Sequence, residues 1–139
     1  MLVRISEMLK HAKKEGYAVP ALAAIDELTS RAAIEAAERM KSPVILLCME
    51  NGNKDLYYFG KMINDFAIRA QIPVALVYDH TASFESAVKG IRAGFNCIMV
   101  DRSQLPYEEN VAQVKELVRI AHAVNVEVES ELRHVGMED

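Results

Sequence analysis

Apolar residues along this chain form two patterns, short unbroken runs and stripes with helical spacing. The run at 73–78 has no polar alternation, which is typical of a strand buried on both faces of a parallel sheet. It stops abruptly at Asp79 and His80, which the strand would deliver to its carboxyl end. Similar runs predict further strands at 18–25, 43–49, 97–100 and 126–132.

In the segments between these strands, apolar residues recur with the spacing of a helix face. The stripes predict helices near residues 5–15, 28–40, 56–70, 83–93 and 106–124. Gly16 and Gly94 follow two of them in the position that favours a left-handed residue, and Ser83 is an expected N-cap. Strands that alternate with helices predict an α/β fold with a parallel sheet and right-handed crossovers.

Composition and charge narrow the classes of protein. The 139 residues are 51% hydrophobic and 26% charged, and no linker or low-complexity stretch interrupts them, so we expect one domain over residues 1–139. A net charge of −4 without a basic stripe argues against a nucleic-acid partner. No apolar run reaches the roughly 18 residues of a membrane span, which predicts a cytoplasmic protein. Cys48 and Cys97 lie in apolar runs and are expected to be reduced core residues.

Acidic residues stand at the end of every predicted strand. They are Asp26, Glu50, Asp79, Asp101 and Glu131. The carboxyl ends of parallel strands meet at one edge, where converging carboxylates repel one another unless a cation or a proton relieves them. Asp26 and Glu50 are equally well explained as helix N-caps. The pair formed by Asp79 and His80 favours a functional site, because it can combine a metal ligand with a general acid or base.

The last predicted strand carries a second group of acids. Glu127, Glu129 and Glu131 alternate along it and therefore share one face. Such a row is costly unless it faces solvent or a lumen that contains charge. Glu131 is nearest the carboxyl end and is the member most suited to meet a metal or substrate, whereas Glu127 is expected to be a structural or solvated charge.

These residues support a resemblance that runs from one end of the chain to the other in consistent order. The chain resembles the N-terminal half of class II, metal-dependent ketose-bisphosphate aldolases, the fructose- and tagatose-bisphosphate aldolase family. The landmarks are Gly16-Tyr17-Ala18-Val19, Ser42-Pro43-Val44-Ile45, the run from Pro73 to Asp79-His80, Ile91-Arg92-Ala93-Gly94-Phe95, Met99-Val100-Asp101-x-Ser103, Leu105-Pro106-Tyr107 and Val128-Glu129-x-Glu131-Leu132.

The resemblance implies a TIM (β/α)8 barrel, of which this chain would supply about the first five βα units. It implies catalytic Zn2+ and cleavage of a phosphorylated ketose to dihydroxyacetone phosphate and an aldehyde. By the same resemblance Asp79 moves the hydroxyl proton and His80 ligates zinc. Asp101 and Glu131 match acidic positions near the metal and are predicted as further metal ligands, and Glu138 matches a further catalytic glutamate.

Substrate-side positions match the family less well. We predict that Glu50, Ser103 and His134 contact substrate, the last through a phosphate. Met49 stands where the family usually has a serine, and Thr81 replaces a glycine after the Asp-His pair. Because of these departures, three alternatives to a typical aldolase stay open. The chain could act on an altered substrate, be a related lyase or isomerase, or be an inactive member of the family.

Length is the largest departure from the family. A full barrel needs about 250 residues, and the second half supplies two more histidine ligands in the family. An open sheet also exposes an edge and an apolar lining, which favours association, so we expect a homo-oligomer. A half-barrel that acts only as a subunit or an interaction module is the alternative from a different class.

Overall fold

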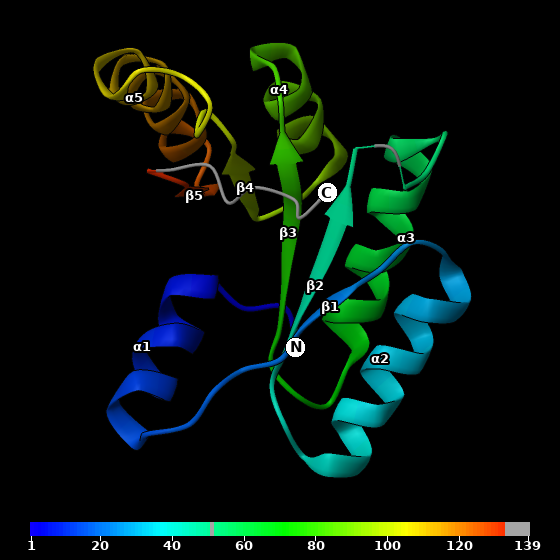
Figure 1. Ribbon diagram of the computed structural model, residues 1–139. Helices are drawn as coiled ribbons and strands as arrows, with labels where there is room; N and C mark the ends of the chain where they lie inside the picture. Colours follow the sequence, from blue (N-terminus) through cyan, green and yellow to red (C-terminus); the bar gives the residue numbers. More distant parts are fainter. Residues whose placement is uncertain (51, 133–139) are drawn as a thin grey trace, which may run out of the picture.

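The computed structural model describes residues 1–50 and 52–132. Helices and strands alternate along the described chain after an initial helix. They are α1 (Ile5–Glu15), β1 (Ala21–Ala23), α2 (Glu27–Met40), β2 (Val44–Met49), α3 (Leu56–Arg69), β3 (Val74–Thr81), α4 (Phe84–Ala93), β4 (Cys97–Val100), α5 (Tyr107–Ala123) and β5 (Glu127–Ser130). Figure 1 shows how these helices and strands are arranged.

The sheet has five strands in the order β1-β2-β3-β4-β5, and every neighbouring pair is parallel. Sequential strands that pair side by side with helical crossovers form successive βαβ units, so the α/β fold expected from the sequence is confirmed. β3 lies in the middle, and its residues 74–78 are all buried, which also agrees with the unbroken apolar run.

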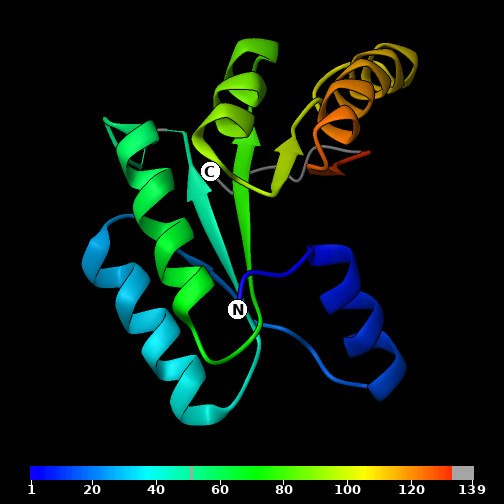
Figure 2. The same cartoon turned by 180° about the vertical axis from the view of Figure 1, so that it is seen from behind.

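Apolar side chains fill both faces of the sheet, but the two faces are covered unequally. The outer face packs Leu46, Leu76 and Ile98 against helix residues that include Ile63 and Leu117. The inner face carries Ile45, Ala75, Val77, Cys97 and Met99, against which α1 packs Ile5 and Met8. Figures 1 and 2 show α1 by itself on the side of the sheet away from α2 and α3. Cys48 and Cys97 are buried and free, as expected.

Local sequence accounts for several helix boundaries. Gly16 and Gly94 end α1 and α4 in the left-handed conformation, with φ of 74° and 96°. Ser83 caps α4 by accepting a hydrogen bond from the backbone of Ser86. Asp26 forms a capping box with Thr29 at the start of α2, which bears out its interpretation as an N-cap.

β1 is shorter than the sequence predicted, spanning residues 21–23 instead of 18–25. The backbone N–H groups of Ile25 and Asp26 both donate to Thr29 Oγ1 at 3.1 Å. These bonds belong to the start of α2, so the strand ends before them. β3, in contrast, is longer, because it continues through Asp79 and His80 to Thr81. Its pairing with β4 shifts register between Tyr78 and Thr81, and His80 has a φ of 49°.

The two outermost strands, β1 and β5, have no strand on their far sides within residues 1–50 and 52–132. Beside β1 the outer face has an apolar groove of about 330 Å³. Its lining includes Pro20, Leu22, Ala33, Ala37 and Met40. Among the described residues, none of the helices combines the length and apolar composition needed to cross a membrane.

Candidate active site

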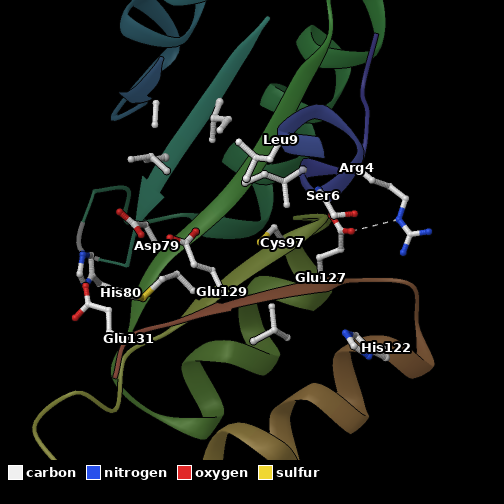
Figure 3. Close-up of a pocket in the computed structure, with 16 residues that line it drawn as sticks. Arg4, Ser6, Leu9, Asp79, His80, Cys97, His122, Glu127, Glu129 and Glu131 are labelled. Atoms are coloured by element: carbon white, nitrogen blue, oxygen red, sulfur yellow. Dashed lines mark hydrogen bonds and ion pairs between the residues drawn. The ribbon is translucent and has the colours of Figure 1, made fainter. Parts of the chain in front are cut away.

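The inner face of the sheet is hollowed beside α1. The hollow has a volume of about 820 Å³ and is lined by residues from α1, β1–β5 and the end of α5. Figure 3 shows Asp79, His80, Glu129 and Glu131 gathered at one end, while Arg4, Ser6 and Glu127 lie toward the other. The first group comes from the carboxyl ends of β3 and β5, the edge at which α/β barrels carry their chemistry.

Asp79 lies at the end of β3 in register with Met49 of β2. Its carboxyl group is half-buried, and this burial raises its pKa. The nearby imidazole of His80 opposes the rise, while the carboxylates of Glu131 and Asp101 add to it. A carboxylate whose pKa is raised toward neutrality is suited to accept and return a proton.

His80 and Asp101 are in direct contact across the ends of β3 and β4. His80 Nδ1 lies 3.1 Å from Asp101 Oδ2, and this contact is the main cause of the raised pKa of the imidazole. The backbone N–H and the hydroxyl of Ser103 donate to Asp101 Oδ1 at 3.1 and 2.7 Å. Those bonds, the hydroxyl first, lower the pKa of Asp101 to about 2. Asp101 is therefore ionised at neutral pH and can only accept, so His80 Nδ1 carries the proton.

Glu127 and Glu129 of β5 and Glu131, which follows the strand, all line the hollow, as their alternation predicted. Glu129 lies in the acidic end, and burial, followed by the charge of Asp79, raises its pKa. Glu127 is at the opposite end, where it accepts a hydrogen bond from the backbone of Ser6 at 3.1 Å and lies 3.5 Å from Arg4 Nε. The expectation that Glu127 is structural agrees with these contacts.

The acidic end has donor groups suited to a divalent metal. Because His80 Nδ1 is engaged by Asp101, the ring nitrogen left for a metal is Nε2, and a carboxylate on the other nitrogen is the usual partner of a metal-bound histidine. Glu131 and Asp79 add carboxylate oxygens to the same hollow. In the part of the chain that the structure describes, however, no group of three such side chains is close enough to hold a metal ion. The donor types fit zinc, but the set is incomplete.

The remaining predicted site residues are placed unevenly. Glu50 follows β2 and is half-buried, but it is not among the residues that line the hollow. Ser103 is buried and directed to Asp101. His134 and Glu138 lie outside the described residues, so their assignments stay predictions.

Two buried polar residues beside the site were missed in the sequence. Arg102 and Asn110 are 6% and 3% exposed, and Asn110 Nδ2 donates to the backbone carbonyls of Arg102 and Glu131, at 2.9 Å each. The sequence offered only a weak signal for them, an arginine and an asparagine near a strand end, because their partners lie on other elements.

Comparisons with known proteins identify the family to which the chain is similar. Residues 3–139 match the model of the family described as fructose-bisphosphate aldolase class-II. The chain is 43% identical to a fructose-bisphosphate aldolase of Thermus caldophilus, covering 100% of this chain and 46% of that protein. It is 37% identical to one of Mycoplasma pneumoniae, covering 100% of this chain and 50% of that protein.

Solved structures give the same result for the fold. The crystal structure of the YdjI aldolase from Escherichia coli K12 superposes with a TM-score of 0.90 at 32% identity, over 95% of this chain and 51% of that one. The five βα units therefore match part of an aldolase barrel. The chain spans about half the length of the relatives it matches.

Proposed function

Because the chain belongs to the class II fructose-bisphosphate aldolase family, we propose that it carries the Asp-His part of the active site of a metal-dependent aldolase. The proposed substrate is a phosphorylated ketose, cleaved to dihydroxyacetone phosphate and an aldehyde. The observation that carries this proposal is the placement of Asp79 and His80, with Asp101 behind the imidazole, at the carboxyl end of the central strand.

His80 Nε2 would hold the metal, and Glu131, which lines the same hollow, would supply a carboxylate ligand. Zinc, when bound, would supply a Lewis acid that polarises the ketone oxygen. Asp101, predicted as a ligand, is already in contact with His80 Nδ1, which supports an orienting role; direct ligation by Asp101 stays a prediction.

Asp79 would accept the proton of the hydroxyl on the carbon being cleaved. As that proton leaves, the carbon–carbon bond breaks, the hydroxyl-bearing carbon becomes the aldehyde, and the electron pair passes to the carbon beside the ketone. A proton delivered to that carbon completes dihydroxyacetone phosphate, a role that we assign to Glu138. The raised pKa of Asp79 supports its part, because a half-buried carboxylate holds a proton more readily than an exposed one does.

A catalytically inactive half-barrel is the second candidate. Two observations favour it, the lack of a three-ligand cluster within residues 1–50 and 52–132 and the coverage of only about half of the relatives. In this case the chain would be a subunit or an interaction module, and zinc ligands from another polypeptide segment would be needed for activity.

Calorimetric titration of the 139-residue chain with Zn2+ separates the two candidates. The matched variants are His80→Ala and His11→Ala; His11 is exposed on α1, where it bonds Tyr17. An aldolase site predicts stoichiometric binding that is lost in His80→Ala and kept in His11→Ala, followed by aldol cleavage of fructose or tagatose bisphosphate. No binding, or binding that His80→Ala leaves intact, would contradict the metal site and favour the inactive half-barrel.

A further inference from the structure

Arg102 is a buried cation directly behind the candidate site. It follows β4, is 6% exposed, and makes no ion pair with any residue in the described ranges 1–50 and 52–132. Burying a guanidinium is costly unless its hydrogen bonds compensate for the lost water. Such a residue calls for an explanation beyond general packing.

The guanidinium bonds to three separate parts of the fold. Nε donates to Gln113 Oε1 of α5 at 2.7 Å. Nη1 donates to the carbonyl of Thr81, the last residue of β3, at 2.9 Å and to the carbonyl of Asp101, just after β4, at 2.6 Å. The planar group, with its fixed directions, therefore ties the ends of two strands to the helix that follows.

These Arg102 hydrogen bonds lie where the pairing of β3 with β4 is irregular. The register of β3 and β4 shifts after Tyr78, and the bond from Asp101 N–H to the Thr81 carbonyl is long, at 3.4 Å. His80, immediately before Thr81, has a positive φ of 49°, an uncommon conformation that surrounding contacts must hold. The bond from Arg102 Nη1 to the same carbonyl oxygen is shorter, at 2.9 Å.

From these contacts we propose that Arg102 is a positioning residue, which holds the ends of β3 and β4 together so that His80 Nδ1 stays against Asp101. His80 precedes Thr81 and Asp101 precedes Arg102, so each bond to a carbonyl fixes one side of the imidazole–carboxylate contact. The positioning is a property of the metal-free chain. Its consequence, an Nε2 atom presented to a cation, rests on the proposed function.

Long-range 1H–15N NMR of the histidine rings tests the positioning directly, because it shows which ring nitrogen carries the proton. In the parent chain above the pKa of His80, we expect the proton on Nδ1. Arg102→Met removes all the donors and keeps an extended side chain. The control is Arg119→Met, which removes an exposed arginine from α5, the helix that also carries Gln113.

The expected result is loss of the Nδ1-protonated form of His80 in Arg102→Met, with the signals of His11 and His122 unchanged and Arg119→Met identical to the parent. An unaltered His80 in folded Arg102→Met overturns the proposal, as does a parent chain whose His80 is not protonated at Nδ1. Equal changes at His11, His80 and His122 would show a general structural role and also overturn it.

A second variant decides the case in which Arg102→Met fails to fold. Gln113→Leu replaces an exposed side chain and frees only the Nε anchor of the guanidinium. We expect a smaller shift of His80 toward the other tautomer, and no change would overturn the positioning role.

Zinc affinity of the same variants separates this proposal from the proposed function. Where the parent binds zinc, we expect Arg102→Met to bind about tenfold or more weakly, in line with the loss of groups that orient metal ligands. If the parent binds no zinc but the His80 tautomer still depends on Arg102, the positioning role holds and the metal site fails. If zinc binds and His80 is indifferent to Arg102, the reverse is true.

Discussion

At the scale of single residues, the candidate site depends on pairs of charges whose protonation states are set by their neighbours. Asp101 is kept ionised by Ser103 and in turn raises the pKa of His80, while Asp79 and Glu129 are made harder to ionise by burial. The acidic end of the hollow thus contains Asp79 and Glu129, whose environment favours a nearby cation or proton, and Asp101 is a strong acceptor in contact with His80.

Replacing Asp101 with asparagine should lower the pKa of His80, which NMR titration of the imidazole would show. His80 has a raised pKa when folded, so its contact stabilises the fold fully below the unfolded value of 6.5 and is lost as pH rises through the folded value. Asp101 has a lowered pKa, so its contribution is present above 3.8 and is lost as pH falls toward about 2.

Urea unfolding of Asp101→Asn should therefore show the largest loss of stability near about pH 5 and a smaller loss at about pH 8. Ser103→Ala provides a comparison, because it removes a bond to the carboxylate without removing its charge. A loss that is the same at both pH values would contradict the charged contact.

Glu129→Gln should stabilise the chain at alkaline pH. The side chain of Glu129 is exposed overall, but partial loss of hydration within the hollow raises its pKa above 4.5 in the folded state, so its ionisation destabilises the fold as pH rises above 4.5. Below that value the acid is protonated in both states, and the variant should match the parent. Chemical denaturation at the two pH extremes measures the difference, with the exposed Glu116→Gln on α5 as control. A variant less stable than the parent at alkaline pH would show that the carboxylate is held by favourable contacts.

At the scale of elements, α1 is the one helix on the inner face among residues 1–50 and 52–132, and the carboxylate of Glu127 bonds to its first turn. Its N-cap, Arg4, makes no side-chain capping bond, whereas Glu127 of β5 accepts from the N–H of Ser6 at 3.1 Å. A carboxylate at this position satisfies an otherwise unpaired donor and interacts favourably with the helix dipole.

Glu127→Ala should release this end of α1. We expect a loss of about 1 kcal/mol in unfolding free energy, the usual cost of deleting a capping side chain. Hydrogen exchange should accelerate in residues 5–15 and not in α4. Glu7→Ala, an exposed acid in the same helical turn, is the matched control. Equal exchange in the two variants would contradict the fastening role of Glu127.

Elements built from local signals were predictable from the sequence, and those set by distant partners were not. Unbroken apolar runs located β2, β3 and β4, and Ser83 and Gly94 bounded α4, because both signals act within a few residues. The contact of Glu127 with Ser6 spans 121 residues, and the bonds of Arg102 join three elements, so no spacing rule could reveal them. Of the five strand-end acids expected to converge, Asp79 and Glu131 line one hollow together with His80, whereas Asp26, Glu50 and Asp101 are not among its lining residues.

At the scale of the whole molecule, the main feature is that helices cover the two faces of the sheet unequally. The outer face is packed by helices, whereas the inner face has α1 and an open hollow, and β1 and β5 leave strand edges without a partner in the described part of the chain. Exposed edges and apolar grooves promote association. The match to about half of an aldolase barrel gives these surfaces a physical reason, because in such a barrel the sheet closes on itself.

We therefore expect the chain to self-associate, and a substitution in the groove beside β1 should weaken that association. Leu22 lines the groove and is 41% exposed, so Leu22→Lys would place a charge against apolar side chains of a partner. Light scattering coupled to size exclusion would report the mass across a dilution series. Leu28→Lys, at a more exposed leucine of α2 outside the groove, should leave the mass unchanged. A parent chain that is monomeric at every concentration would refute the expectation, while equal effects of both lysines would show that association does not use this groove.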